Sequence, residues 1–318
     1  MSVTAPRTVE APPQTQLATR APRRIAWRRR GDDGPTRVPG QRSLLVRALV
    51  AVIVVVWSLP TMGLLISSFR PAAEISTTGW WTVFAHPFEV TQWTLENYAG
   101  VLAEQGMFDA FVNSVVIAIP ATVIPISLAA FAAYAFAWID FPGRKPLFAL
   151  VVGLLVVPLQ MTFIPLLELY VRWDLTGTYL GTWLAHTGFG LPMAVFLLYN
   201  YIADLPKEIL ESAYVDGASH FAAFTRLVLP LAAPVLAAFA IFQFLWVWND
   251  FLVAFVFLGT SSDVAVLTAQ LQQLVGTRGE SWHLLTAGAF VSMVVPLVVF
   301  LAMQRHFVRG LLTGGVKG

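Results

Sequence analysis

The sequence predicts an all-α membrane protein, a bundle of six transmembrane helices. Three observations support this: 57% of the residues are hydrophobic, only 12% are charged, and long apolar runs recur along the chain. The mean hydropathy is +0.69. A soluble domain usually carries about 25% charged residues. Half of that charge cannot cover a water-facing surface, so most of the surface is expected to face lipid.

Six apolar runs are long enough to cross a bilayer. They are Leu44–Ser68, Ala110–Trp138, Pro146–Leu167, Tyr179–Ile202, Leu231–Leu258 and Leu284–Met303. A helix needs about 20 residues to cross about 30 Å of hydrocarbon. Membrane strands are excluded because the runs lack the alternation of a barrel. The prolines within the runs predict kinks, which a membrane bundle tolerates when neighbouring groups pair the freed carbonyls.

The distribution of positive charge predicts the orientation. Seventeen of the twenty Lys and Arg residues lie in the two termini and in loops 138–145 and 203–230, and only Arg70, Arg172 and Arg278 lie in the other loops. Because positive residues favour the cytoplasmic side, both termini are expected inside the cell, which requires an even number of spans. The localisation expected is the plasma (inner) membrane of a bacterial cell.

The composition divides the chain into three parts. Residues 1–42, rich in Pro, Thr, Arg and Gly, are expected to form a disordered basic cytoplasmic tail. Residues 43–304 form the membrane domain, and residues 305–318 a second cytoplasmic tail. The longest outer segment, 69–109, contains several tryptophans and acids, which favours either a surface for an external partner or anchoring at the membrane interface.

Several kinds of chemistry are absent from the sequence. There is no cysteine, and the five histidines lack the spacing of a metal site. None of the three lysines stands in the Gly-Lys-Ser/Thr context that binds ATP phosphates. The chain is therefore expected to be no enzyme and to bind no metal or ATP itself. Few charges lie within the spans, which disfavours ion-coupled transport.

Loop 203–230 is the longest cytoplasmic loop and is predicted to be structured. Asp204 is expected to cap a helix that has Pro206 in its first turn and ends at Gly217. A second short helix is expected from Phe221 to Val228, with its end at Pro230.

The first of these helices is predicted to have one apolar face. Its members are Ile209, Leu210, Ala213 and Tyr214. Such a face suits a groove on a soluble partner, and it equally suits packing on the inner ends of the protein's own bundle. The residues leave both interpretations open.

The same loop resembles the EAA loop of ABC importer permeases. The resemblance rests on Glu211-Ser212-Ala213, followed by Gly217 and by Leu229-Pro230; Ser212 replaces the usual Ala. It implies that the loop is a coupling helix that docks on a separate ATPase, which would bind the ATP and Mg²⁺. The residues expected at that contact are Glu211, Ser212, Ala213, Asp216, Gly217, Leu229 and Pro230.

Three further stretches resemble the maltose-type carbohydrate permeases, and the resemblance covers roughly residues 43–318. Residues 246–251 and 304–318 are similar to the smaller maltose permease subunit. By that resemblance the C-terminal tail reaches between ATPase subunits, with Gly310, Gly314, Gly315 and Lys317 as the expected contacts. Residues 271–283 resemble α-glucoside permeases, which implies a substrate such as maltose, trehalose or sucrose.

The resemblance implies an assembly of several chains in membrane lipid, without nucleic acid. The expected partners are a second permease subunit, two ATPase subunits and an extracytoplasmic sugar-binding protein. A substrate path is expected at Trp246, Trp248, Asn249 and Asp250, although these side chains equally suit interfacial anchoring or bonds between helices. The alternatives are an ion-coupled secondary transporter, an importer of another substrate such as glycerol phosphate, and a scaffold that only binds an ATPase.

Overall fold

The computed structural model describes residues 44–275 and 281–314, with side chains up to Ala302. The predicted tail 1–42 therefore lies outside the described residues. The chain divides into two compact units, one ending at Val56 and one beginning at Trp57. The described part of the first unit is the beginning of one helix, and the second unit contains all the features discussed below.

The described residues form helices and connecting loops, and none of them lies in a strand. The long helices are α1 (Leu44–Ser68), α4 (Met107–Trp138), α7 (Tyr179–Ala203), α10 (Leu229–Trp248) and α13 (Trp282–Gly314). The shorter α-helices are α2 (Ala72–Thr77), α3 (Glu96–Ala103), α5 (Arg144–Gly153), α6 (Phe163–Arg172), α8 (Lys207–Val215), α9 (His220–Ala223), α11 (Leu252–Phe257) and α12 (Leu267–Val275). Short 3₁₀ helices are η1 (Trp80–Ala85), η2 (Val90–Gln92), η3 (Leu154–Val156) and η4 (Leu159–Thr162), and η5 (Phe224–Val228) is a π-helix.

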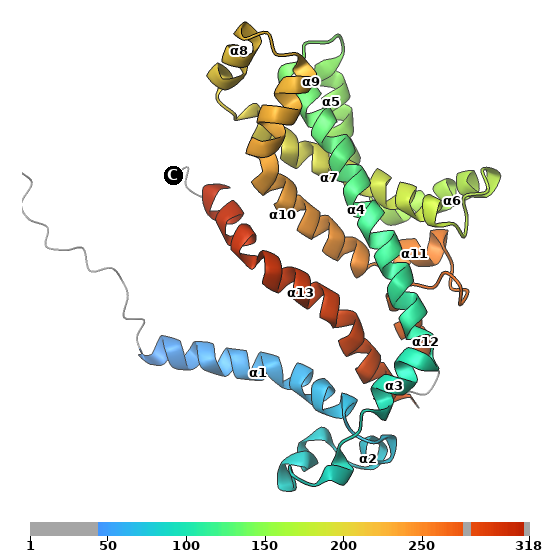
Figure 1. The fold of residues 1–318 in the computed structure, drawn as a ribbon. Helices are drawn as coiled ribbons and strands as arrows, with labels where there is room; N and C mark the ends of the chain where they lie inside the picture. Colours follow the sequence, from blue (N-terminus) through green and yellow to red (C-terminus); the bar gives the residue numbers. More distant parts are fainter. Residues whose placement is uncertain (1–43, 276–280, 315–318) are drawn as a thin grey trace, which may run out of the picture. The chain divides into compact units, whose positions relative to one another are not determined.

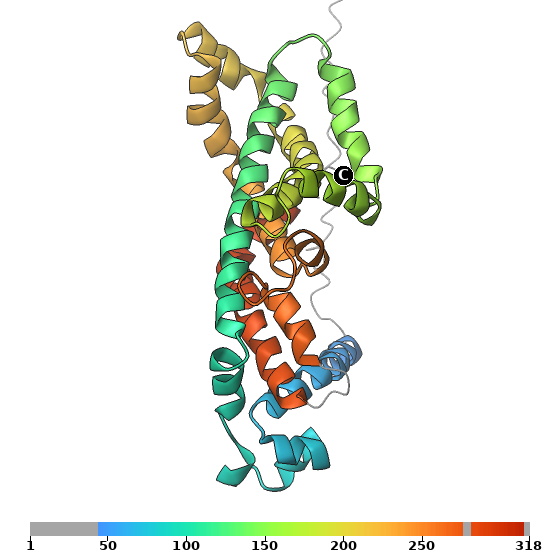
Figure 2. The same ribbon diagram turned by 90° about the vertical axis from the view of Figure 1, so that its right-hand side faces the viewer.

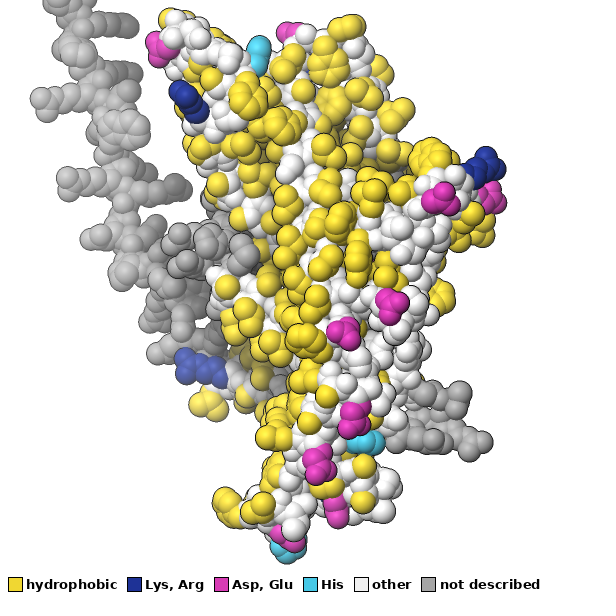
Figure 3. Space-filling model, turned by 45° about the vertical axis from the view of Figure 1, so that its right-hand side comes forward, with side chains coloured by type: hydrophobic (Ala, Val, Ile, Leu, Met, Phe, Trp, Pro, Cys, Tyr) yellow, Lys and Arg dark blue, Asp and Glu magenta, His cyan; other side chains and the backbone are white. Residues whose placement is uncertain are grey.

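Five helices of the described chain are long and apolar enough to cross a membrane, and a sixth crossing exists if one bent pair forms a single span. The all-α membrane class predicted from the sequence is confirmed. Figure 3 shows apolar side chains over most of the face in view, as expected for a surface in contact with lipid or with other apolar helices.

The third predicted run, Pro146–Leu167, contains a sharp bend at one of the prolines that predict kinks, and its two helical segments extend beyond the predicted bounds. The two segments Arg144–Val156 and Leu159–Arg172 meet at an angle of 101°. The break falls at Val157, which is extended with φ −73° and ψ 119°. The physical reason is Pro158, which disfavours the helical conformation of the residue before it and cannot donate a backbone hydrogen bond.

The fifth span also differs from its predicted bounds at both ends. The predicted stop at Pro230 does not occur, because α9, the π-helix η5 and α10 run on as one span from His220 to Trp248. Pro230 lies in the first turn of α10, directly after the π-helix. A π-turn changes the hydrogen-bonding register of a helix, and the first turn tolerates a residue without an N–H. The span then ends at Trp248, so Asp250 lies outside it.

Helix α4 is the centre of the packing. It lies against α7 and α10, and α10 in turn packs on α13 (Figures 1 and 2). The contact surfaces contain small, fully buried residues, namely Ala118, Ala121, Ala129, Ala133 and Ala194. Small side chains let helix backbones approach closely, which is how membrane helices gain packing energy. At Gly190 the approach is so close that a Cβ atom would lie 2.6 Å from Nε2 of Gln243.

Side chains of α4 also hold a loop near its N-terminal end. The amide nitrogen of Asn113 donates to the carbonyls of Asp263 and Ala265 at 3.2 and 3.0 Å. The hydroxyl of Tyr179 donates to Oδ1 of Asn113 at 2.7 Å. The hydroxyl of Ser114 accepts from the backbone N–H of Leu267 at 2.8 Å. The backbone groups of this loop, which no helix satisfies, thus find partners on α4.

The bundle has two distinct ends. Helices α5, α8 and α9 gather at the C-terminal end of α4, whereas α2, α3 and α12 gather at its N-terminal end (Figures 1 and 2). Figure 3 shows acidic side chains from the middle of the face in view to its lower end, and further charged side chains at the upper end and on the right-hand protrusion.

Replacing Asn113 with alanine is expected to destabilise the protein. The change leaves the buried carbonyl of Ala265 and the part-buried carbonyl of Asp263 and hydroxyl of Tyr179 without their partner, and a buried unsatisfied group costs about 1–3 kcal/mol. The midpoint of thermal unfolding in detergent should fall by several degrees. The matched control is Ser127→Ala, because that exposed hydroxyl bonds only to the carbonyl of Val123 in its own helix. Equal midpoints for the two variants would contradict the prediction.

Candidate functional site

The α8 loop is built around a helix of nine residues, Lys207–Val215. Its N-cap position is held by Pro206, so the predicted capping by Asp204 is wrong. Asp204 instead occupies the C-cap position of α7. Proline can begin the helix because the first N–H groups of a helix have no partner inside it. Glu208 lies in the first turn, where a negative charge is favourable.

The end of α8 has the geometry that the sequence predicts. Gly217 has a φ of +81°, and its N–H donates to the carbonyl of Tyr214 at 3.0 Å. The N–H of Ala218 donates to the carbonyl of Ala213 at 2.9 Å. This pair of bonds is the Schellman motif. Space does not require a glycine here, since nothing lies within 4 Å of the position that a Cβ atom would occupy, and the positive φ alone favours it.

The structure decides between the two interpretations of the apolar face of α8. Leu210 is 1% exposed and belongs to a buried cluster with Leu198 and Ile202 of α7 and with Phe224 and Val228 of η5. Tyr214 packs against the same cluster. The apolar face of α8 is therefore covered by the bundle itself.

The opposite face of α8 points away from the bundle. Its exposed residues are Glu208, Glu211, Ser212, Val215 and Asp216. The Val215 side chain is 88% exposed, and the neighbouring Phe221 on α9 is 67% exposed. Two large apolar side chains beside several carboxylates form a small protruding surface that combines hydrophobic and acidic character. We call these six residues the α8 outer face.

Three polar side chains join α8 to the membrane helix α4. The Tyr134 hydroxyl lies 3.0 Å from the Tyr214 hydroxyl, and each of the two lies 3.1 Å from Nδ1 of His220. Tyr134 is on α4, Tyr214 on α8 and His220 at the start of α9. We call this group the tyrosine–histidine triad. Phe224 packs against Tyr134 at a ring distance of 5.3 Å, so the triad rests on buried aromatic packing.

The remaining predicted docking residues lie around this helix. Ala213 is half-buried on the inner side of α8, while Ser212 is exposed and its hydroxyl donates to the carbonyl of Ile209. Leu229 packs against the buried cluster under α8, and Pro230 is exposed at the beginning of α10. The residues accessible to a partner are therefore Glu211, Ser212, Asp216 and Gly217. Ala213 and Leu229 lie on the side that faces the bundle and support them.

The predicted C-terminal tail begins as a continuation of the last helix. Helix α13 runs from Trp282 to Gly314 and includes Gly310 and Gly314. Gly315 and Lys317 lie outside the described residues. The backbone therefore continues the span as helix through most of the segment that was predicted to reach toward the ATPases.

Two of the predicted substrate-path residues have partners within the fold. The indole N–H of Trp248 donates to the carbonyl of Ser292 at 3.1 Å, and its ring stacks on Phe244. The carboxylate of Asp250 accepts from the backbone N–H groups of Val253 and Ala254 at 3.3 and 3.0 Å. Asp250 therefore caps α11 and satisfies backbone groups at the break between two helices.

The other two predicted substrate-path residues, Trp246 and Asn249, lie at the end of α10. Trp246 is half-buried, and its ring meets His186 edge-on at a centroid distance of 5.3 Å. Asn249 is exposed and donates to the carbonyl of Leu245 in its own helix at 2.7 Å.

Sequence reasoning missed His186. This residue of α7 is 1% exposed, and its Nε2 lies 3.8 Å from the carboxylate of Asp250. Its Nδ1 is buried and has no hydrogen-bond partner. The only signal in the sequence was a histidine inside an apolar run. The proximity to Asp250 depends on the packing of α7 against α11 and cannot be predicted from the sequence.

The described residues contain no cluster of three or more His, Cys, Asp or Glu side chains that could hold a metal ion. The only acidic residues on α8 are Glu208 and Glu211, and both are exposed. The accessible features of the site suit the binding of another macromolecule.

Comparisons with known proteins identify the family. Residues 110–313 match the model of the family described as binding-protein-dependent transport system inner membrane component. The osmoprotective compounds uptake permease protein GgtD of Synechocystis sp. is 59% identical, with 87% of this chain and 93% of that protein covered. The alpha-glucoside transport system permease protein AglG of Rhizobium meliloti is 44% identical, with 88% and 99% covered.

The fold is also similar to a solved structure. A chain of a bacterial ABC transporter involved in the import of the acidic polysaccharide alginate aligns with a TM-score of 0.70 and 16% sequence identity. The alignment covers 86% of this chain and all of that one. At this identity the likeness concerns the fold alone. The family match and the two permease relatives show that the chain belongs to the family of binding-protein-dependent transport system inner membrane components, as a permease subunit of an ABC transporter, which is a transport component and not an enzyme.

Proposed function

We propose that this chain forms half of the translocation pathway of an ATP-driven sugar importer. The observation that carries the proposal is the α8 outer face, an exposed acidic and apolar surface fixed to the end of α4 by Leu210 and the tyrosine–histidine triad. Such a surface can receive force from a partner and pass it to a membrane helix. The two relatives, a permease for osmoprotective compounds and an alpha-glucoside permease, support a sugar-like substrate.

The proposed substrate is an α-glucoside such as maltose, trehalose or sucrose. The identity of 44% to the alpha-glucoside permease supports this class. The identity of 59% to the permease for osmoprotective compounds fits a small glucoside that also serves as a compatible solute. Competition for uptake among these sugars and glycerol phosphate separates the proposed class from the alternative substrate.

The proposed partners are a second permease subunit, two ATPase subunits and an extracytoplasmic binding protein, in the plasma membrane. The family description itself names dependence on a binding protein. ATP and Mg²⁺ belong to the ATPase subunits in this proposal. Both termini and the α8 loop face the cytoplasm, because that side then carries most of the Lys and Arg residues.

The proposed mechanism is a rigid-body movement driven from α8. When the ATPase dimer closes, it displaces the α8 outer face. The triad and the buried Leu210 transfer this displacement to α4 and α7, which pack closely along their length. Closely packed elements move as units between discrete arrangements, so the bundle switches between inward-facing and outward-facing states. The loaded binding protein and ATP bias these two states.

For the sugar path we propose Asn249 and Trp246 as the contacting groups. Asn249 is exposed at the end of α10 and offers an amide for sugar hydroxyls. Trp246 offers part of an aromatic face. Trp248 and Asp250 act as positioning residues in this proposal, because their polar atoms are occupied within the fold. The C-terminal segment, with Gly310, Gly314, Gly315 and Lys317, is proposed to approach the ATPases.

The simplest rival is a secondary transporter, and one experiment separates it from the importer. In liposomes the purified chain alone should carry no sugar along a proton or sodium gradient. Uptake should require the second permease, the ATPases, the binding protein and ATP. Sugar transport by the single chain down an ion gradient would disprove the importer proposal.

Reversing a charge on the α8 outer face should uncouple the ATPase. In Glu211→Arg we expect ATP-driven uptake to fall more than tenfold, because a cation replaces an exposed carboxylate at the proposed contact, where like charges would cost several kcal/mol. Co-purification of the ATPase and sugar uptake are the measurements. The control is Glu89→Arg, which reverses another exposed charge at the other end of the bundle and should leave co-purification of the ATPase unchanged. Normal uptake with Glu211→Arg would contradict the role of this surface.

Removing one hydroxyl from the triad should weaken the transfer of force. In Tyr214→Phe the ring remains and the hydrogen bonds to Tyr134 and His220 are lost. A hydrogen bond contributes about 0.5–1.5 kcal/mol, so the number of sugars moved per ATP should fall roughly 2- to 10-fold while ATPase binding is kept. The control is Tyr201→Phe, whose hydroxyl bonds to the carbonyl of Leu231 and not to α8. An unchanged ratio, or an equal loss in the control, would refute the role of the triad.

Truncating Asn249 should affect the handling of sugar and not the assembly. Its amide bonds only to the carbonyl of Leu245, so Asn249→Ala should leave the purified complex intact. We expect a several-fold higher KM for sugar uptake, because one hydrogen bond to the substrate is lost. Gln273→Ala, another exposed amide that bonds only to a loop carbonyl, serves as the control. If both variants transported sugar with the KM of the native protein, Asn249 would not contact the substrate.

A further inference from the structure

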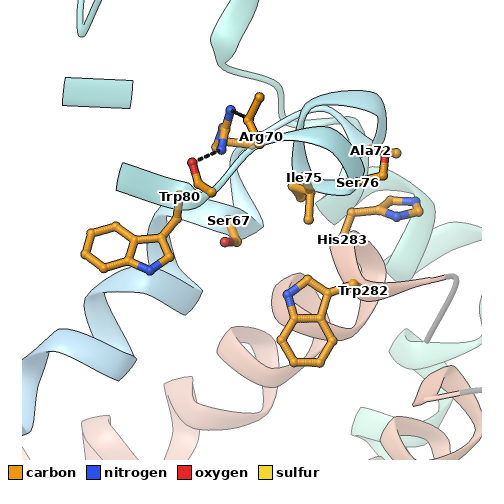
Figure 4. A pocket seen from close by; sticks show the side chains of 10 residues that line it. Ser67, Arg70, Ala72, Ile75, Ser76, Trp80, Trp282 and His283 are labelled. Atoms are coloured by element: carbon orange, nitrogen blue, oxygen red, sulfur yellow. Dashed lines mark hydrogen bonds between the residues drawn. The ribbon is translucent and has the colours of Figure 1, made fainter. Parts of the chain in front are cut away.

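A cavity of about 390 Å³ lies at the end of the bundle opposite α8. Its walls come from the last turn of α1, from residues 70–80 and from the first two residues of α13 (Figure 4). Figure 4 shows Ser67 and Arg70 on one side of it and Trp282 and His283 on the other. The helices that end here, Leu44–Ser68 and Trp282–Ala302, are both long and apolar enough to span a membrane. The cavity therefore lies at the depth where a membrane surface is expected.

The charged wall of the cavity is Arg70, which is 1% exposed. Its guanidinium donates to the carbonyl of Gly79 at 2.9 Å and to the hydroxyls of Thr78 and Thr82 at 2.7 and 3.3 Å. Glu74, half-exposed, approaches it at 3.4 Å. The Nε atom of Arg70 is buried and has no hydrogen-bond partner. A buried guanidinium with an unused donor is costly unless a further acceptor is present.

Other donors that line the cavity also lack partners. Ser67 is 7% exposed, and its hydroxyl makes no hydrogen bond with any described residue. The same holds, within the described chain, for the indole N–H group of Trp282, whereas the indole nitrogen of Trp80 packs against Gly63 of α1. Four other indoles of the protein each donate to a backbone carbonyl; they belong to Trp93, Trp138, Trp183 and Trp248. Several unused donors thus meet around one cavity.

The chemistry of these groups defines the ligand. Arginine and tryptophan side chains only donate hydrogen bonds, and Arg70 adds a positive charge. The matching ligand carries several acceptor oxygens and a negative charge. A neutral sugar fits less well, because its hydroxyl groups donate as well as accept, and the one carboxylate beside the cavity already faces Arg70. A phosphate group meets all these requirements.

The position of the cavity indicates which molecule supplies the phosphate group. Tryptophan is enriched where helices leave the hydrocarbon, at the level of the lipid headgroups, so a phosphate group of a lipid lies within reach of this cavity. Trp282 is 45% exposed at the start of its span, so its ring can contact lipid while its N–H faces the cavity. We propose that this cavity binds the phosphodiester headgroup of a membrane lipid, which joins the end of α1 to the beginning of α13.

The test uses the purified full-length chain in nonionic detergent, with binding measured by titration calorimetry. The probes are dihexanoylphosphatidylglycerol, inorganic phosphate, and dihexanoylglycerol, which lacks the phosphate. The native protein should bind the phospholipid more tightly than inorganic phosphate and should not bind dihexanoylglycerol. The double variant Ser67→Ala/Trp282→Phe removes two donors and keeps the aromatic ring. Its affinity for the phospholipid should fall at least about tenfold, as expected for bonds to a charged group.

The matched control is Trp173→Phe, which removes an equally unused indole N–H from an exposed tryptophan at the end of α6. It should bind the phospholipid like the native protein. Thermal unfolding of each variant, with midpoints within a few degrees of the native one, establishes that the fold is kept.

Three results would overturn the proposal. The first is equal affinity of the double variant and the native chain for the phospholipid. The second is equal affinity of the native chain for inorganic phosphate, which would make the cavity a site for free anions. The third is the absence of phospholipid binding together with weaker capture of the binding protein by the double variant, which would make the cavity a site for a carboxylate of that protein. None of these results depends on which sugar is transported.

Discussion

Every backbone N–H and C=O group at membrane depth must find its partner inside the protein, because lipid offers none. The long helices pair most of these groups within themselves. At the breaks between helices, particular side chains pair the backbone groups. The carboxylate of Asp250 caps α11 where α10 has ended. Asn113 and Ser114 pair the backbone of the loop that follows α11. These polar residues stand in apolar surroundings because the irregular backbone needs them, so their presence in or beside a span does not by itself indicate a substrate path.

The same constraint shapes the two ends of the bundle in different ways. At the α8 end the apolar face of the loop helix is covered by the bundle, and only the acidic and apolar outer face is accessible. The tyrosine–histidine triad connects that helix to α4 by side-chain bonds alone. At the other end, donors around Arg70 remain unused within the described chain. The α8 end is therefore suited to a contact that transmits movement. The end with Arg70 is suited to binding a hydrogen-bond acceptor from outside the chain.

Much of the candidate site was predictable because it depends on local geometry. Gly217 adopts the positive φ that ends α8, and the Glu211-Ser212-Ala213 pattern supplied the family resemblance that the comparisons confirm. The capping by Asp204 and the stop at Pro230 were predicted wrongly. A proline is compatible with two outcomes, the start of a helix or its break, and only the neighbouring hydrogen bonds decide between them. His186 and Arg70 gave no usable signal, because their partners come from distant segments or from groups on a folded loop.

Hydropathy over about 20 residues and short motifs depend only on neighbouring residues, so the class of the protein, the approximate positions of its spans and its family could be predicted from the sequence. The tertiary structure decided how the spans are used. It showed that the third run is bent by 101° and that the fifth begins at His220. It also placed Leu210 in the core and Glu211 outside it. These properties arise from packing between α4, α7 and α10, which are distant in the chain, and local patterns cannot determine which neighbour each face meets.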